Sequence, residues 1–302
     1  MPDQLTLRRT AESIFIETAT VAIARYVFEP HSPKGEAPKP FLHPLKTLSG
    51  APLSIHRPWD HRWHKGLQMT WSHVSGENFW GGPTFHIDEG YRWIDNLGSI
   101  RHESFSTFSE ECGVDVSFEE NLAWYTSRDQ RWIDERRTHR FHSVDHERGL
   151  WALDFSTTLR NVGATSLVLG SPGTEGRPSA GYTGFFWRGP RSFTGGKIVA
   201  STGVQQDEIM GTEADWVAFV GQHDDIDGGA TVLAFAGSVE PSVPIKWFVR
   251  SEPFACIAPA ASFDKEVMLG PDDSLTLRHR HVFVDHMAPP EELAELGREF
   301  AL

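Results

Sequence analysis

Ionisable and aromatic side chains are concentrated in one segment, residues 56–80, which reads HRPWDHRWHKGLQMTWSHVSGENFW. Its ionisable residues include His56, Arg57, Asp60, His61, His64, Lys65 and His73, and its tryptophans are Trp59, Trp63, Trp71 and Trp80. Removing an ionisable group from water is unfavourable, so such a density is expected where the groups face water, a ligand or a metal. Because imidazole exchanges protons near neutral pH, we interpret the segment as the wall of a small-molecule site.

The spacing within this segment fits acid/base chemistry. A catalytic imidazole must reach the reacting group and be oriented by a carboxylate. We predict His61 and His64 as the catalytic imidazoles and Asp60 as the orienting carboxylate. Cations that hold a carboxylate or oxyanion, and aromatic faces that stack on a sugar ring, complete the predicted site. These substrate-binding candidates are His56, Arg57, Lys65, Trp63 and Trp80. A structural polar cluster is the alternative.

The same histidines also allow a metal site. The H-x-x-H spacing of His61 and His64 places two imidazoles on one metal if the backbone turns between them, and His56 would be a third ligand. The pattern lacks the glutamate that makes H-E-x-x-H specific for a metalloprotease. We therefore predict no cofactor, with a divalent metal at these three histidines as the alternative.

A second polar and aromatic cluster, YTGFFWRGPR, lies at residues 182–191. Its predicted substrate-binding residues are Trp187, Arg188 and Arg191, because guanidinium groups bind carboxylates in a bidentate manner. Surface ion pairs are the alternative for these arginines. The enzymatic interpretation requires this cluster and the imidazoles of residues 56–80 to meet around one water-accessible hollow.

Two further histidine clusters are assigned from their local patterns. The stretch THRFHSVDH, with His139, His142, Asp145 and His146, is expected to form the polar tip of a hairpin. The stretch RHRH at residues 278–281 alternates as a strand does, so His279 and His281 share one face. If that face points inward, one of the two histidines could join the site.

Composition restricts the classes of partner. The chain has 302 residues, 28 basic and 41 acidic, and a formal net charge of −13. So negative a protein repels phosphate backbones and anionic lipids, which argues against nucleic-acid and membrane binding. There is no apolar run long enough to cross a membrane, the N-terminal residues lack the apolar core of a signal peptide, and Cys112 and Cys256 form no motif. We expect a cytoplasmic protein with a small-molecule (sugar) ligand, and a homo-oligomer is compatible with the sequence.

Short strand-like runs dominate the chain. They lie at residues 13–26, 113–118, 122–125, 150–159, 166–169, 197–201, 216–221, 231–236, 246–249, 266–269 and 274–284, and turn signals separate many of them. Many short strands at this spacing predict an all-β sandwich or barrel. Residues 289–300 carry helix signals, and the Pro-rich residues 29–39 are expected to form a loop. We predict one antiparallel β-sandwich domain over residues 1–302, with a short C-terminal helix.

Several blocks resemble the bacterial PmoA-like family, catalogued as methane oxygenase PmoA-like domains of unknown function. The blocks are HRPWDHRWHKGL followed by GENFWGG, the upstream PFLHPLKTLSG, the middle GFFWRGPR and the late PIKWFVR. The family's recurrent polar residues fall on His43, Arg57, Asp60, His61, His64, Arg188, Arg191 and Arg250. The resemblance implies a carbohydrate substrate, while the family's name implies kinship with a methane monooxygenase subunit.

The strand pattern also resembles the galactose mutarotase-like supersandwich. The N-H-x-Y-F-N-L block that carries the mutarotase histidine is absent from the sequence, which argues against aldose 1-epimerase activity. We predict a carbohydrate-active enzyme that applies histidine acid/base chemistry to a sugar or sugar-derived acid, by epimerisation, elimination or hydrolysis. The alternatives are a non-catalytic carbohydrate-binding β-sandwich and a metal-dependent oxygenase or hydrolase.

Overall fold

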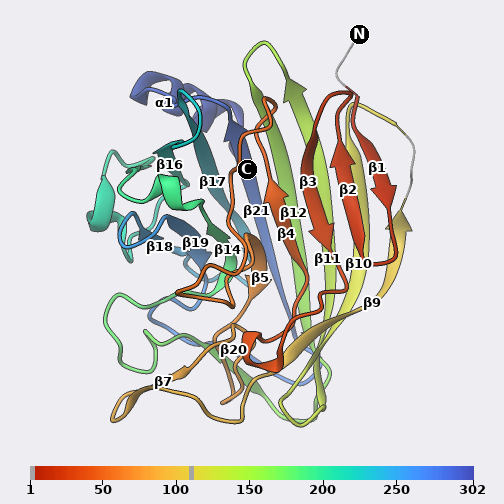
Figure 1. Cartoon of the computed structure of the whole chain (residues 1–302). Coiled ribbons are helices and arrows are strands. Elements are labelled where there is room, and N and C mark those ends of the chain that lie inside the picture. The colour runs from red at the N-terminus through yellow and green to blue at the C-terminus, as the bar shows by residue number, and fades with distance from the viewer. Residues whose placement is uncertain (1–3, 109–111) are drawn as a thin grey trace.

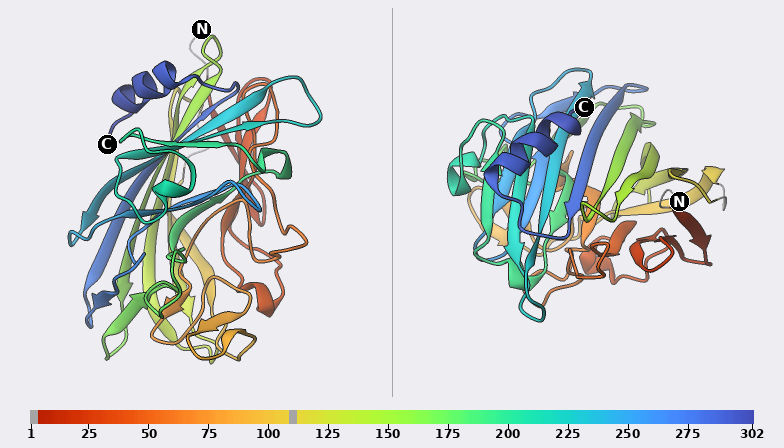
Figure 2. Two further views of the ribbon diagram at one scale, coloured as in Figure 1. Left: turned by 90° about the vertical axis from the view of Figure 1, so that its left-hand side faces the viewer. Right: turned by 90° about the horizontal axis from the view of Figure 1, so that it is seen from above.

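Two large antiparallel sheets stack face to face in the computed structural model, which describes residues 4–108 and 112–302 (Figure 1). The first residues of the N-terminal segment considered above, 1–3, lie outside the described residues. The α-helix of the described part, α1 (Pro290–Glu299), lies on the outside of one sheet (Figure 2). The predicted all-β sandwich with a C-terminal helix is confirmed, and no helix in residues 4–108 or 112–302 is long and apolar enough to cross a membrane.

Each large sheet has eight strands. The first has the order β1 (Thr6–Arg9), β2 (Ser13–Glu17), β3 (Ala22–Val27), β4 (Phe41–Leu45), β5 (Leu67–Thr70), β14 (Gly184–Arg188), β19 (Cys256–Ala260) and β18 (Lys246–Arg250). The second has the order β15 (Lys197–Ala200), β16 (Trp216–Gln222), β17 (Gly229–Glu240), β21 (Ser274–Val284), β12 (Leu150–Asn161), β11 (Arg131–Asp145), β10 (Val116–Tyr125) and β9 (Ser99–Phe108).

Smaller elements lie outside the two large sheets. A three-stranded sheet has the order β20 (Val267–Leu269), β13 (Leu167–Gly170) and β6 (His73–Val74), and a hairpin pairs β7 (Thr84–His86) with β8 (Gly90–Arg92). Short 3-10 helices are η1 (Lys34–Glu36), η2 (Arg191–Phe193) and η3 (Gln206–Ile209). The predicted loop at residues 29–39 therefore contains one helical turn.

The alternation of side chains along each strand separates two apolar regions. In β12, Trp151 and Leu153 join the core between the sheets, whereas Leu150 and Ala152 lie on the opposite face. That outer face is covered by α1, whose Leu293 and Leu296 are buried against it, together with Phe300 just beyond the helix. Burial of one such side chain contributes about 1.5–3 kcal/mol. The helix therefore covers the part of the outer face formed by β12, β16, β17 and β21.

The outer face of the first sheet is used differently. In β14, Phe185 and Trp187 point into the core, and Phe186 points outward. In β18, Trp247 and Val249 point inward, and Phe248 points outward. The outward residues form a separate apolar cluster of Trp80, Phe186, Phe248, Phe254, Cys256 and Ala258. This cluster is the floor of the cavity described below.

Some local predictions are wrong. The run at residues 13–26 is a hairpin of β2 and β3, while the runs at 113–118 and 122–125 belong largely to one strand, β10. His139 and His142 are not at a hairpin tip: both are buried in β11, and the turn itself follows Asp145. Their burial follows the alternation of a long strand, which the polar composition of the segment concealed.

The RHRH prediction is confirmed in its geometry. His279 and His281 share the inward face of β21 and pack near Phe185 in the core. Neither residue lines the cavity over the outer face of the first sheet. They therefore do not join the candidate site.

Candidate functional site

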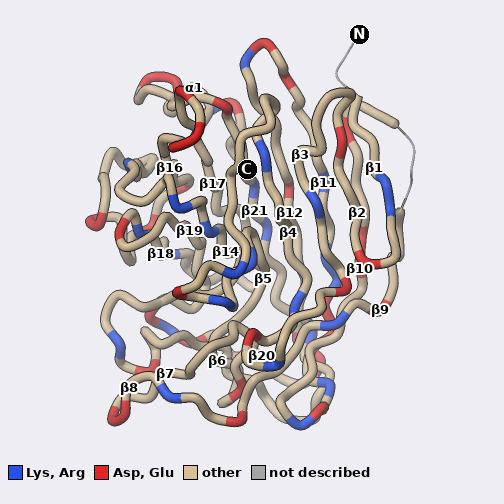
Figure 3. Tube along the Cα trace, in the orientation of Figure 1, with Lys and Arg blue, Asp and Glu red and all other residues tan. Residues whose placement is uncertain are grey.

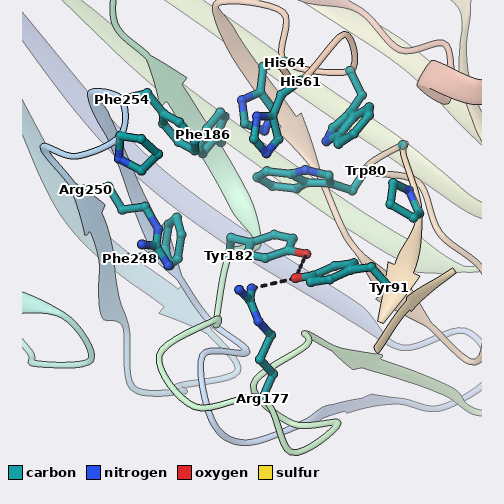
Figure 4. Close-up of a pocket in the computed structure, with 14 residues that line it drawn as sticks. His61, His64, Trp80, Tyr91, Arg177, Tyr182, Phe186, Phe248, Arg250 and Phe254 are labelled. Atoms are coloured by element: carbon teal, nitrogen blue, oxygen red, sulfur yellow. Dashed lines mark hydrogen bonds between the residues drawn. The ribbon is translucent and has the colours of Figure 1, made fainter. Parts of the chain in front are cut away.

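A cavity of about 410 Å³ lies over the outward side chains of β14 and β18. Its volume is within the range of small-molecule sites, roughly 300–1,000 Å³. It is lined by His61, Trp63, His64, Trp80, Gly81, Pro83, Tyr91, Arg177, Tyr182, Phe186, Phe248, Arg250, Pro253 and Phe254. Figure 4 shows the two imidazoles on one wall, with Arg250 and Arg177 on other sides and the rings of Trp80 and Tyr182 between them.

Two tight turns between β4 and β5 bring the imidazoles together. The backbone N–H of His61 donates to the carbonyl of Pro58 at 3.1 Å, and that of His64 donates to the carbonyl of His61 at 3.0 Å. The rings of His61 and His64 consequently stack, with centroids 4.7 Å apart and planes 18° from parallel. The backbone turn required between the two histidines is present.

Asp60 orients His61. Its carboxylate accepts a hydrogen bond from Nδ1 of His61 at 3.0 Å, so the lone pair of the neutral ring is on Nε2. Burial lowers the pKa of His61, although the Asp60 carboxylate opposes this shift. The ring is therefore neutral at pH 7, and its Nε2 is suited to accept a proton.

His64 has the other tautomer, with its proton on Nε2. The guanidinium of Arg188 donates to Nδ1 of His64 at 2.8 Å, and because arginine has no acceptor, the imidazole proton must be on Nε2. Burial, together with the charge of Arg188, holds the pKa of His64 well below its ordinary value. Side by side, the two rings present one nitrogen that accepts a proton and one N–H that donates a hydrogen bond.

Asp60 connects this pair to the second predicted cluster. Its two carboxylate oxygens accept hydrogen bonds from Arg188 at 3.2 Å and from Arg191 at 2.7 Å. Burial opposes ionisation of Asp60, but the hydrogen bond from His61 and the charge of Arg188 outweigh it and lower the pKa. The Arg188 side chain is only 1% exposed, so it positions Asp60 and His64 rather than reaching a ligand. The structure thus changes the role predicted for Arg188, whereas Arg191 is 42% exposed and binds Asp60 from outside the residues that line the cavity.

The aromatic wall contains two of the three predicted tryptophans. Trp80 packs against Tyr182 and Phe186, with ring centroids 4.8 Å away in each case. Trp63 lies against the backbone that follows Trp80: a Cβ at Gly81 or Gly82 would come within 2.7 Å of it, and both glycines have positive φ. The pair of glycines therefore makes room for the indole.

Trp187 is not a substrate-binding residue. It is fully buried between the sheets, and its indole N–H donates to the carbonyl of Leu53 at 2.8 Å. Its neighbour Phe186 faces the cavity instead, because adjacent residues of a strand point to opposite faces. The prediction for Trp187 is wrong by one position.

A second ionic group, here called the Glu36 cluster, binds the cations predicted near the histidines, Arg57 and Lys65. The Glu36 carboxylate accepts a bidentate hydrogen bond from Arg57, at 2.7 and 2.9 Å, and also binds Lys65. Lys39 lies beside them and donates to the carbonyls of Glu36 and Ala37. Arg57 and Lys65 thus hold a carboxylate of the protein itself, contrary to their predicted contact with substrate.

The three histidines of the alternative metal site are not grouped. The ring of His56 stacks on Phe41 and His43, with centroids 4.9 and 5.3 Å away, and does not line the cavity. Within the described residues, no group of three or more His, Cys, Asp or Glu side chains is arranged to hold a metal ion. Asp60 lies beside His61, but its carboxylate is hydrogen-bonded to Nδ1 of His61 and to two arginines.

Sequence reasoning missed the opposite wall. A chain of hydrogen bonds runs from Arg177 to the hydroxyl of Tyr91 at 2.6 Å and on to the hydroxyl of Tyr182 at 2.9 Å (Figure 4). Arg250 and Phe248 both lie in the block PIKWFVR of the family resemblance, which singled out only Arg250. These residues come from three distant segments, and no local spacing marks them.

A model of one protein family matches residues 14–298. The chain belongs to this family, DUF6807, a family of unknown function. Its description contains no methane oxygenase name. None of the curated proteins compared with this DUF6807 chain matches it.

Several solved structures are similar in fold. The GH36 α-galactosidase AgaA from Geobacillus stearothermophilus is 10% identical with a TM-score of 0.40, and the match covers 94% of this chain and 41% of that enzyme. The α-galactosidase from Lactobacillus brevis is 8% identical, with a TM-score of 0.40 and coverages of 94% and 40%. The chain thus spans about two fifths of the length of these enzymes. A GalM/aldose epimerase homologue from C. elegans is 9% identical, with a TM-score of 0.34 and coverages of 94% and 99%.

Proposed function

We propose that this DUF6807 protein is an enzyme that acts on a sugar or a sugar-derived acid by acid/base proton transfer. The observation that carries the proposal is the pairing of Asp60 with His61, which leaves Nε2 of a neutral imidazole in a ligand-sized cavity. A carboxylate that fixes the tautomer and orientation of a catalytic imidazole is a recurrent arrangement in acid/base catalysis. The aromatic wall beside it suits the C–H faces of a sugar ring.

The two imidazoles have different roles: His61 is the base, and His64 is a hydrogen-bond donor. Nε2 of His61 takes the proton from the substrate or from a water, and the resulting imidazolium is stabilised by Asp60. The N–H of His64 donates to the oxygen on which negative charge develops. Delivery of a proton from solvent to the opposite face of the same carbon gives epimerisation, and loss of a leaving group from the adjacent carbon gives elimination. In hydrolysis the deprotonated water attacks the substrate, and the His61 imidazolium returns its proton to the departing group.

The proposal is tested by His61→Ala, assayed by NMR in D₂O against a panel of sugars and sugar acids. We expect turnover or hydrogen exchange to fall about 10²–10⁴-fold, the usual contribution of a positioned base. Because the His61 side chain is 34% exposed, the melting temperature should barely change. His31→Ala, which removes a surface imidazole that also pairs with a carboxylate, is the matched control. Full activity of His61→Ala would contradict the proposal.

A non-catalytic carbohydrate-binding protein is the second candidate. It is favoured by the aromatic lining, since Trp63, Trp80 and Phe248 can stack on a sugar without any proton transfer. Calorimetric binding of a sugar that is unchanged in a His61→Ala, His64→Gln double variant, with no turnover by the parent protein, would support this candidate. Binding and turnover lost together would support the enzyme.

A further inference from the structure

The charges that line the cavity are all of one sign. Its charged residues are Arg177 and Arg250, and none of the described residues that line it is Asp or Glu. This contrasts with the whole chain, in which 41 acidic residues outnumber 28 basic ones and are distributed along the trace (Figure 3). A cationic cavity in so acidic a protein requires a specific explanation.

We infer that the cavity is built for an anionic sugar whose carboxylate is bound by Arg250, with Tyr182 and Arg177 beside it. The inference rests on the proposed function, because it names the substrate class of the same cavity. It assigns the carboxylate to the side away from the imidazoles, where Figure 4 places Arg250 and Arg177.

Arg250 is the principal reason. Its guanidinium lies 5.4 Å from the ring centroid of Phe248, and within residues 4–108 and 112–302 it has no carboxylate partner. The neighbouring arginines are satisfied by the protein: Arg188 and Arg191 share Asp60, and Arg57 holds Glu36. A guanidinium left without an anion beside apolar rings is suited to bind the carboxylate of a ligand in a bidentate manner.

The hydroxyl groups of Tyr91 and Tyr182 supply further donors. Arg177 donates to the Tyr91 hydroxyl, which shares a hydrogen bond with the Tyr182 hydroxyl, so one of the two phenolic protons is left for a ligand. Burial raises the pKa of Tyr182 well above its ordinary value, so the phenol stays protonated. Nearby positive charges and protonated hydroxyls recognise a carboxylate better than they recognise a neutral hydroxymethyl group.

Matched pairs of ligands test this charge preference by calorimetry. The pairs are D-galacturonate with D-galactose and D-glucuronate with D-glucose, which differ only in replacement of the hydroxymethyl group by a carboxylate. D-Glucose 6-phosphate tests for phosphate as the source of the anion. We expect at least one acid to bind about tenfold or more tightly than its neutral partner, and its binding to weaken as salt is added.

Substitutions of single arginines test which residue is responsible for the preference for acids over neutral sugars. Arg250→Gln should weaken binding of the acid by about tenfold to a hundredfold and change binding of the neutral sugar little. Arg250→Lys should be intermediate, because a point charge replaces a bidentate group. Arg62→Gln removes one exposed positive charge beside His61 but outside the cavity, and should change neither. Melting temperatures show whether each variant is folded, and Arg177→Gln provides a second variant, at the other cation that lines the cavity.

The outcomes separate this inference from the proposed function. Equal binding of acids and neutral sugars, binding of the phosphate alone, binding of none of the ligands at millimolar concentration, or a folded Arg250→Gln with unchanged affinity would each overturn the anionic substrate. Binding of an acid that depends on Arg250, without turnover or exchange of its hydrogens, would overturn the enzyme and leave the inference standing. Turnover of a neutral sugar that is unaffected by Arg250→Gln would overturn the anionic substrate and leave the proposed enzyme standing.

Discussion

Residues 56–65 contribute to two ionic groups that lie on different sides of the same loop. One group is closed by ion pairs within the protein, and the other leaves an imidazole nitrogen open to a cavity. In the Glu36 cluster, Arg57 and Lys65 meet a carboxylate from η1, and the Lys65 side chain is only 1% exposed. In the cavity, Asp60 meets Arg188 and His61, and one nitrogen of His61 faces open space. Similar residue types thus form a closed structural cluster in one place and an open site in the other.

The Glu36 cluster and the Asp60 group differ in whether every polar group has a partner within the protein. Glu36 brings Arg57 and Lys65 to one carboxylate, so each cation already has an anion of the protein. Asp60 holds Arg188 and Arg191 in the same manner, but the imidazole that it orients retains a lone pair for a ligand. A dense run of ionisable residues therefore indicates chemistry only where one polar atom is left without a partner in a cavity.

The largest expected effect is that of Asp60→Asn on activity. An amide at this position can donate to Nδ1 of His61, which would move the imidazole proton to Nε2 and remove the base. We expect kcat/KM to fall on the order of 10³-fold on the substrate found in the screen. An activity within threefold of the parent protein would show that Asp60 has only a structural role, which is to connect its loop to Arg188 and Arg191.

The residual activity of this variant has a further signature. The Asp60 carboxylate raises the pKa of His61 against the effect of burial. Its removal should lower that pKa further, so the acid limb of the kcat/KM profile should move to lower pH. In the parent protein the limb should already lie below pH 6.5, the ordinary value for histidine. A limb that stays in place, or moves upward, would exclude His61 as the titrating base.

The next effect is that of Glu36→Gln, which should act on stability. It leaves the buried Lys65 without its carboxylate, and removal of one partner of a buried pair costs about 3 kcal/mol. Equilibrium denaturation measures the loss, while kcat should stay within a few-fold because no residue that lines the cavity is altered. Loss of activity without loss of stability would reverse the assignment of the two clusters.

The pH dependence of stability follows from the same carboxylate. Burial opposes ionisation of Glu36, but Arg57 and Lys65 outweigh it and lower the pKa below the ordinary 4.5. Its ion pairs therefore contribute fully above pH 4.5, and this contribution is lost as the pH falls through the lowered pKa. The difference in stability between the parent protein and Glu36→Gln should narrow in that acid range. A difference that does not depend on pH would indicate that the pairing is not ionic.

Much of the fold could be predicted because strands carry a local signal. The run at residues 274–284 alternates clearly and is β21 with the same bounds, and the proline and glutamates after residue 288 mark α1. Shorter strands such as β5 and β14 are buried on both faces, so they lack the alternation that identifies a strand. They are recognised only from their pairing, which is not a property of the local sequence.

The candidate site was half predictable for a similar reason. His61 and His64 are close in sequence, so a turn is enough to stack them. Whether Arg57 or Arg188 reaches a ligand depends on Glu36 and Asp60, and only the three-dimensional structure shows which carboxylate meets which cation. Arg177 approaches the cavity from a loop that carries no motif. Residues brought together by the sheet, and not by the local chain, could not be found from spacing.

The smallest expected effects come from a matched pair of half-exposed arginines. Arg57 is 39% exposed and binds Glu36, and Arg191 is 42% exposed and binds Asp60, each at 2.7 Å. Exposed ion pairs contribute about 1 kcal/mol or less, so Arg57→Gln and Arg191→Gln should destabilise the protein equally little.

Activity should distinguish these two variants where stability does not. Arg57→Gln should leave kcat unchanged, because Lys65 still holds Glu36 on the closed side of the loop. Arg191→Gln removes one of the two guanidinium groups that fix Asp60, so the carboxylate should orient His61 less well. A reduction of about twofold to fivefold is expected, less than 1 kcal/mol. Equal kcat values for both variants would mean that Arg188 alone fixes the carboxylate, whereas a larger loss in Arg57→Gln would show that the Glu36 cluster, and not the open cavity, supports the reaction.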